Sequence, residues 1–186
     1  KLSGQTDIVI GTPMENRAQV QTQPLIGYFV NSVPMRCQLK SDLSIAELIG
    51  QVHQLNLDAK RYQMLPFEQI VGLANVVRDA SRHPLFQAFF TLNQFSDVVD
   101  VENSSACFAP ELDEQVLEYT PAKFDLTLDV TMGKEQIDIV LNYATDLFSD
   151  HTATNMLNIY HQVLLCMCTA QVEDSSALKL LSDNEV

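Results

Sequence analysis

The chain has 186 residues, of which 46% are hydrophobic, so it can fill the core of one domain without a metal or a disulfide. The 11 Lys and Arg residues are outnumbered by 24 Asp and Glu residues, and the formal net charge is −13. This charge disfavours binding to nucleic acid or to an anionic membrane. No apolar stretch reaches the length of about 18 residues that a transmembrane helix needs, and the amino terminus carries no signal-peptide pattern. We therefore expect a soluble, cytoplasmic protein.

The four cysteines show no metal-binding spacing, because the sequence contains no Cys-x-x-Cys pair. Cys37 and Cys107 stand apart, and Cys166 and Cys168 fall in an apolar, helical stretch where their side chains point in different directions. We expect no metal site. We interpret the cysteines as small core residues of a protein that is kept reduced in the cytoplasm.

The first part of the chain predicts two strands separated by a loop. Asp7–Gly11 has the composition of a short buried strand, and the polar stretch 12–23, closed by Pro24, predicts a loop. A second strand is expected over 28–39, where Pro34 lacks a backbone N–H. This proline indicates either an edge position or a bulge.

Two helices are expected next. Ser44 and Glu47 are spaced as a capping box, and apolar residues then recur at intervals of three and four, which predicts a helix over 45–62. Pro66 is expected at the first position of a shorter helix that ends near Leu73.

The middle of the chain predicts a buried strand over the Phe-rich stretch 85–92 and a loop over the acidic stretch 97–113. Alternating apolar residues then flank Gly133 and Lys134, which suit a turn. The pattern predicts a hairpin over 126–143.

Ser149 or Asp150 can cap a final helix, whose apolar stripe extends to Met167. Strands that alternate with helices around a mixed sheet favour an α/β or α+β fold. We expect one domain over 1–172, and the polar stretch 173–186 is interpreted as the start of a linker.

No self-contained catalytic site is apparent in the sequence. A catalytic histidine needs an orienting partner, and none of the four histidines lies in a paired motif. The sequence contains neither a Gly-x-Ser-x-Gly elbow nor a glycine-rich phosphate loop. The histidines are interpreted as surface or packing residues: His53, His83, His151 and His161.

Three compact clusters differ from the rest of the chain. The first is 26–36, in which the amide of Asn31 interrupts an apolar strand. A buried polar group there costs ~1–3 kcal/mol unless it is hydrogen-bonded. Asn31 therefore either ties down neighbouring backbone, which we favour, or faces a pocket.

The second cluster, 65–68, is explained by helix capping, because Pro66 starts a helix and Glu68 complements its positive end. The third cluster, 78–85, concentrates hydrogen-bonding groups before a buried strand. It predicts a structured turn in which Asp79 accepts backbone amides. The alternative is a site for an anionic ligand.

Taken in this order, the clusters resemble three successive motifs of the condensation domains of nonribosomal peptide synthetases. Residues 26–36 resemble the motif Ile-Gly-x-Phe-Val-Asn-Thr with its trailing arginine, residues 63–68 resemble Gln-Asp-x-Pro-Phe-Glu, and residues 78–85 resemble Arg-Asp-x-Ser-Arg-Asn-Pro-Leu. Flanking stretches also look typical of the family, so the similarity spans nearly the whole chain. Three positions depart from the motifs: Ser32, Met64 and His83.

The resemblance implies a fold like chloramphenicol acetyltransferase, with two related halves, each a mixed sheet flanked by helices, and a tunnel between them. It implies amide formation between carrier-bound aminoacyl or peptidyl thioesters. No cofactor is expected to bind directly, and the phosphopantetheine arms of the carrier proteins are the expected substrates. The family's His-His-x-x-x-Asp-Gly motif is absent from this sequence. The chain is therefore expected to be the carboxy-terminal half, which supplies one wall of the tunnel and no catalytic residue.

The resemblance also implies partners and site residues. The expected partners are the amino-terminal half of the domain, peptidyl carrier proteins and an adjacent adenylation domain. Asn31 and Ser32 are the candidates for positioning substrate at the tunnel. The other motif residues are expected to be structural: Gly27, Phe29, Arg36, Pro66, Phe67, Glu68, Arg78, Asp79, Ser81, Arg82 and Pro84.

Two alternatives stay open at this point. The chain could be a non-catalytic structural module that docks carrier proteins, or half of an epimerising or ester-forming relative. It starts without Met and enters strand-like sequence at once, which favours a piece of a longer protein. An isolated half is expected to be inactive. A histidine motif encoded upstream of Lys1 would favour the condensing enzyme.

Overall fold

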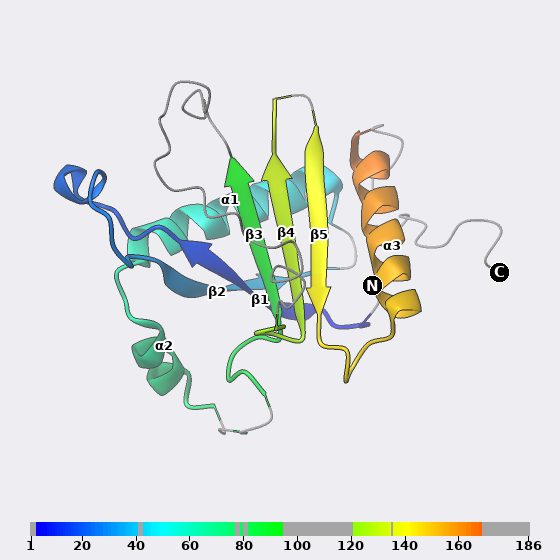
Figure 1. The fold of residues 1–186 in the computed structure, drawn as a ribbon, viewed down its shortest axis with the longest axis horizontal. Helices are drawn as coiled ribbons and strands as arrows, with labels where there is room; N and C mark the ends of the chain where they lie inside the picture. The colour runs from blue at the N-terminus through cyan, green and yellow to red at the C-terminus, as the bar shows by residue number, and fades with distance from the viewer. Residues whose placement is uncertain are drawn as a thin grey trace, which may run out of the picture.

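The computed structural model describes residues 3–40, 43–76, 79, 82–94, 121–134 and 136–168. These residues form a five-stranded mixed sheet in the order β2-β1-β3-β4-β5, with helices packed beside it (Figure 1). The expected mixed α/β architecture is confirmed. The strands are β1 (Asp7–Met14), β2 (Asn31–Gln38), β3 (Ala88–Gln94), β4 (Leu126–Met132) and β5 (Ile137–Tyr143). The helices are α1 (Ile45–Tyr62), α2 (Phe67–Ala74), α3 (Asp150–Cys168) and a short 3-10 helix, η1 (Val20–Thr22).

The strand β2 is an edge strand that pairs antiparallel with β1. The register runs without a break from Asp7 opposite Gln38 to Met14 opposite Asn31, and Pro34 lies opposite Gly11. Because the register matches residues one to one, Pro34 causes no bulge. Of the two predicted explanations for this proline, the edge position is therefore the correct one.

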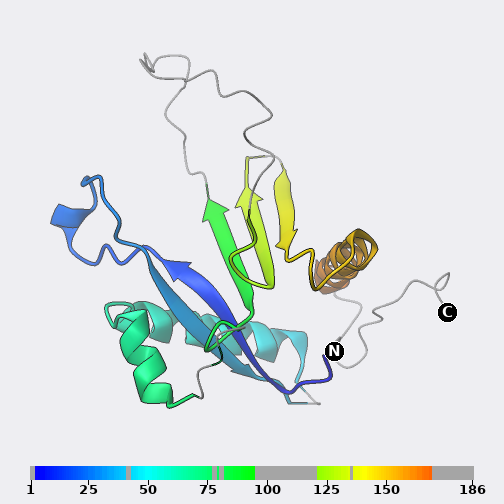
Figure 2. The ribbon, with the colours of Figure 1, turned by 60° about the horizontal axis from the view of Figure 1, so that its bottom comes forward.

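The parallel contact between β1 and β3 is short. The two strands are paired at Gly11 and Phe89, whereas β3 pairs with β4 over its full length. Beyond Gly11 the arrows of β1 and β3 point apart in both ribbon views (Figures 1 and 2). The sheet therefore has a seam that opens towards the carboxyl ends of these two strands.

The most deeply buried large side chain is Phe86, which is 1% exposed. Its ring is surrounded by other rings: the centroid distance is 5.9 Å to Phe67, 5.9 Å to Phe89 and 5.5 Å to Phe124. Phe89 and Phe124 stack with their planes 6° apart. Edge and offset contacts of this kind stabilise a core beyond the area that they bury. This aromatic cluster joins the start of β3 to the start of β4.

The expected helices are present, and one of them, α2, starts differently from the prediction. The capping box of α1 is formed: the Glu47 N–H donates to Ser44 Oγ and the Ser44 N–H donates to Glu47 Oε2. Pro66 caps α2 and does not open it as expected, because its ψ of 142° is extended. Ser149 caps α3, because its Oγ accepts a hydrogen bond from the Thr152 N–H. Of the two predicted caps, Ser149 and Asp150, Ser149 is therefore the correct one.

Three strands have limits that differ from the prediction. β1 continues to Met14, three residues into the expected loop, because this segment pairs with the start of β2. β2 begins at Asn31, and Tyr28, which was placed in this strand, is 93% exposed. β3 begins at Ala88 and ends at Gln94, later than expected. Pairing between strands determined these limits more strongly than local composition did.

Several sequence expectations lie outside the described residues: the loop 97–113, the linker 173–186 and Cys107. Cys37 and Cys166 are half-buried, but Cys168 is exposed, so the core interpretation is wrong for this cysteine. In the part of the chain that the structure describes, no helix is both long and apolar enough to cross a bilayer.

Candidate functional site

Asn31 connects the first two sequence clusters. Its Nδ2 donates one hydrogen bond of 2.9 Å to the carbonyl of Gln63 and one of 2.8 Å to the carbonyl of Leu65. Both carbonyls lie in the turn between α1 and α2. The favoured interpretation of Asn31, a tie to neighbouring backbone, is therefore confirmed. Both amide hydrogens are used, so the side chain fixes the start of β2 against this turn.

Gln63 extends this connection to the end of β1. Its Oε1 accepts a 3.2 Å hydrogen bond from the N–H of Asn16, whose φ of 53° is left-handed. The Asn16 Oδ1 is buried and has no hydrogen-bond partner among the described residues. Asn31, Gln63 and Asn16 thus hold together the end of β1, the start of β2 and the end of α1, and we call these three residues the amide bracket.

His83, from the third cluster, packs against rings. Its centroid lies 4.1 Å from Phe86, 5.1 Å from Phe67 and 5.1 Å from Phe124. Nδ1 is buried without a hydrogen-bond partner in the described structure, and burial lowers the pKa of this imidazole. The contact with Phe67 brings the second and third clusters together. His83 is thus a packing residue, as expected for the histidines.

The rest of the third cluster is described in part. The Arg82 N–H donates to the Asp79 carbonyl at 3.3 Å, and their exposed side chains approach to 4.0 Å. The hydrogen bond from residue 82 to residue 79 favours the predicted turn over an anion site. Residues 80 and 81 between them, Ala80 and Ser81, and the candidate Arg78 lie outside the described residues. Pro84 is half-buried where the chain enters the aromatic cluster.

The remaining candidate residues do not form a single cluster. Arg36 makes an exposed, two-pronged ion pair with Asp7 across β1 and β2, with Nη2 2.6 Å from Oδ2, and its hydrogen bonds lower the pKa of Asp7. Ser32 is half-buried opposite Pro13. Phe29 lies 4.2 Å beneath the guanidinium of Arg17. Two further candidates, Gly27 and Glu68, are exposed.

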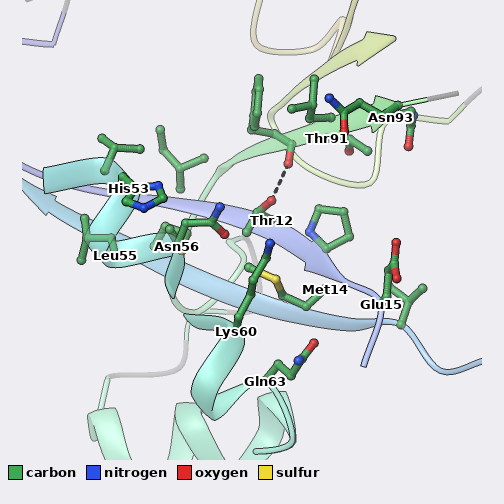
Figure 3. Close-up of a pocket in the computed structure, with 18 of the residues that line it drawn as sticks. Thr12, Met14, Glu15, His53, Leu55, Asn56, Lys60, Gln63, Thr91 and Asn93 are labelled. Carbon is green, nitrogen blue, oxygen red and sulfur yellow. Dashed lines mark hydrogen bonds between the residues drawn. The ribbon is translucent and has the colours of Figure 1, made fainter. Parts of the chain in front are cut away.

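A cavity of about 900 Å³ lies next to the amide bracket, between α1 and the open seam of the sheet (Figure 3). Gln63 of the bracket lines it. At the seam, Thr12 Oγ1 donates a 3.0 Å hydrogen bond to the Phe90 carbonyl, where a backbone bond between β1 and β3 would otherwise be expected. The cavity is therefore a consequence of the early separation of these strands.

The walls of the cavity mix apolar and polar side chains on both sides: Thr12, Thr91 and Asn93 come from the strands, and Val52 and Leu55 come from α1. The strands contribute Ile10, Met14, Met35, Phe90 and Leu92, among others. Figure 3 shows polar side chains reaching from α1 towards the strands: His53, Asn56 and Lys60. Together with Gln63 they recur at intervals of three and four. The expected surface position of His53 is confirmed, because this residue is exposed, but the polar stripe that it forms with Asn56, Lys60 and Gln63 was not predicted.

Three ionisable groups of the cavity differ in their surroundings. Arg17 donates to the carbonyls of Thr22 and Leu25, so its charge is engaged by its own loop. Lys60 makes no hydrogen bond or ion pair with any residue that the structure describes. Burial raises the pKa of the Cys37 thiol, which disfavours the nucleophilic thiolate. The arrangement is suited to binding and positioning a ligand.

Comparisons with known proteins agree with the sequence motifs. The model of the family described as Condensation domain matches residues 1–186. Surfactin synthase subunit 1 of Bacillus subtilis (strain 168) is 35% identical over 185 residues, which is 100% of this chain and 5% of that protein. The chain thus spans a small part of the relatives that it matches.

Two solved structures have similar folds. A four-domain nonribosomal peptide synthetase bound to AMP and glycine has a TM-score of 0.80 at 24% identity, with 98% of this chain and 15% of that chain covered. The complex of the X-domain and OxyB from teicoplanin biosynthesis has a TM-score of 0.76 at 24% identity, with 96% and 39% covered. The expected chloramphenicol acetyltransferase-like fold is supported by these neighbours. With the family model matching from end to end, the chain belongs to the condensation-domain family of nonribosomal peptide synthetases.

Proposed function

We propose that this chain is the carboxy-terminal half of a condensation domain, which joins two carrier-bound aminoacyl or peptidyl groups by an amide bond. The cavity beside the amide bracket is the observation that carries this proposal, because it gives this half a site at which a substrate can be held. The cavity wall would be this half's share of the substrate tunnel. The histidine motif would belong to the remainder of the domain.

The reaction requires the acceptor amine to attack the donor thioester carbonyl. Amide formation between two tethered substrates depends strongly on their alignment, and polar groups near the developing charge add to it. The two hydrogen bonds of Asn31 favour a positioning role, since its donors are occupied by backbone carbonyls. In this proposal Asn31 holds Gln63 at the cavity wall, and the catalytic base comes from the other half.

The proposed substrates and partners follow from the family. Phosphopantetheine arms of carrier proteins would deliver both acyl groups, and no cofactor would bind to this half directly. The amino-terminal half of the domain, the carrier proteins and an adjacent adenylation domain would be its partners. The isolated chain would be inactive, because the sequence contains no adjacent histidine pair.

A docking function is the second candidate. One structural neighbour, the X-domain from teicoplanin biosynthesis, is described in complex with another protein, OxyB. If this chain acts in a similar way, it would recruit a protein and form no bond.

Amide formation in the intact synthetase tests the proposal. The protein that contains this chain would be supplied with donor and acceptor carrier proteins loaded with aminoacyl groups, and the products on the acceptor would be measured by mass spectrometry. We expect a product joined by an amide bond from the intact protein and none from the isolated chain. Carrier binding without any product would favour docking, whereas an inverted stereocentre or an ester product would favour the epimerising or ester-forming alternatives.

A further inference from the structure

Lys60 is an unpaired cation at the cavity of a strongly acidic chain. The chain carries 24 acidic residues, yet the ammonium of Lys60 has no carboxylate within ion-pair distance among the described residues. In Figure 3 its side chain extends from α1 towards Thr12, while the carboxylate of Glu15 lies towards the opposite side of Met14. Glu15 also lines the cavity but makes no ion pair with Lys60, so the exposed ammonium of Lys60 is available to an anionic ligand.

The surroundings of Lys60 limit the kind of anion. Met35, Phe90 and Leu92 line the sheet side of the cavity and offer apolar contacts, and Asn56 lies one turn before Lys60 on the same face of α1. Lysine acts as a point charge, whereas the guanidinium of Arg17, which suits forked contacts with phosphate, is already bound to backbone carbonyls. A short apolar chain that ends in one carboxylate matches this arrangement.

We propose that the cavity binds an acyl group that ends in a carboxylate, and that Lys60 determines this specificity. The ligand's identity as a carrier-bound acyl group rests on the proposed function, but its preference for a carboxylate rests on the cavity. The apolar part of the acyl chain lies along Met35 and Leu92, and the carboxylate accepts hydrogen bonds from Lys60 Nζ and Asn56 Nδ2. An acyl group that ends in an ammonium is repelled by Lys60 and is selected against.

Cys37 provides a direct measure of occupancy, because it also lines the cavity. The cysteines at 107, 166 and 168 would be replaced with serine, and the rate at which a maleimide modifies Cys37 would be followed by mass spectrometry. Three probes of equal length would be compared: glutaric acid monobutylamide, the neutral N-butylglutaramide and the cationic 5-aminopentanoic acid butylamide. The first ends in a carboxylate, the second in a carboxamide and the third in an ammonium.

We expect the carboxylate probe to slow the modification of Cys37 at lower concentration than the carboxamide, and the ammonium probe to have no effect. Lys60→Gln should weaken protection by the carboxylate about three- to tenfold and leave protection by the carboxamide unchanged. The matched control is Arg61→Gln, which removes the next positive charge on α1, one that does not line the cavity. Equal protection by all three probes, or equal weakening in the two variants, would overturn the proposal.

A second measurement does not depend on the serine replacements. If the serine replacements unfold the chain, the same probes can be titrated into the unmodified, isotope-labelled chain, where carboxylate-dependent amide shifts should centre on α1 and the seam. Absence of such shifts would also overturn the proposal. These experiments measure binding of the probes to the chain alone. The carboxylate preference can therefore be absent while the intact synthetase still forms amide bonds, and it can be present while the synthetase forms none.

Discussion

Gly11 and Phe86 are packed so closely that a Cβ atom on Gly11 would lie 2.2 Å from Cε2 of the Phe86 ring. Gly11 is also the residue at which β1 pairs with β3. The missing side chain therefore lets the most buried aromatic ring lie beneath the point where the two strands join. We predict that Gly11→Ala lowers the free energy of unfolding by ~1–3 kcal/mol, the usual cost of overpacking, measured by urea denaturation of the chain.

The matched control for this change is Gly50→Ala on α1. A Cβ at position 50 would meet no atom within 4 Å, and alanine has a higher helix propensity than glycine. This variant should gain up to about 1 kcal/mol in the free energy of unfolding. If the two alanines change stability by the same amount, the contact between Gly11 and Phe86 has no special role.

The hydrogen bonds of Asn31 lead to a second prediction. Asn31→Ala removes both donors and leaves the carbonyls of Gln63 and Leu65 without that partner, at a cost of ~1–3 kcal/mol in the free energy of unfolding. Asn31→Asp should be at least as damaging, because a carboxylate would face two carbonyl oxygens. Both changes should also reduce amide formation by the intact synthetase.

Ser32→Ala is the control for Asn31. The Ser32 hydroxyl makes no side-chain hydrogen bond that the described structure records, although it adjoins Asn31 on β2. Its loss should change the urea midpoint little. A stable, fully active Asn31→Ala variant would contradict the importance of the amide bracket.

Local signals predicted the helices well, because their causes lie close together in sequence. The capping box of Ser44 and Glu47 and the periodicity after it gave the limits of α1, and the hairpin of β4 and β5 followed from alternation around Gly133. The backbone tie of Asn31 was also foreseen, since a buried amide in an apolar strand needs partners. Its two acceptors, the carbonyls of Gln63 and Leu65, could not be foreseen, because they lie more than 30 residues away in the sequence.

The cavity could not be predicted, because it depends on where two distant strands separate. Thr12 and the Phe90 carbonyl are 78 residues apart in sequence, and nothing local indicates that a side chain there takes the place of a backbone bond. Thr12 itself was placed in a loop for the same reason. The position of Lys60 at the cavity depends on the same separation, so the sequence alone does not indicate it.

The hydrogen bond from Thr12 leads to a third prediction. Thr12→Val keeps the shape of the side chain and removes the donor, so the seam between β1 and β3 should loosen at a cost of ~0.5–1.5 kcal/mol in the free energy of unfolding. Thr12→Ser keeps the hydroxyl and should retain more of this stability. Cys37, on the neighbouring wall, should react faster with a maleimide in the valine variant than in the serine variant. Identical Cys37 reactivity in both would show that the hydroxyl does not hold the seam.

The half-buried imidazole of His83 leads to a final prediction, on pH. Burial among Phe67, Phe86 and Phe124 lowers the pKa of His83 below its ordinary value of 6.5. At pH values above 6.5 the imidazole is neutral in both the folded and the unfolded chain, so the full stability is present. As the pH falls below 6.5 the unfolded chain takes up the proton first, and stability is lost until the folded pKa is passed.

The comparison of His83→Phe with the unchanged chain isolates this effect. Phenylalanine retains the ring packing and cannot titrate, so the difference in urea midpoint between the two proteins should grow in favour of the variant as the pH is lowered from 7.5 to 5.5. His161→Phe on α3 is the control, and it leaves His83 in place. The other ionisable groups are present in both members of each pair, so their contribution cancels from the comparison. A difference that stays constant with pH would mean that His83 titrates alike in the folded and unfolded states, and that its ring is more hydrated than the buried Nδ1 indicates.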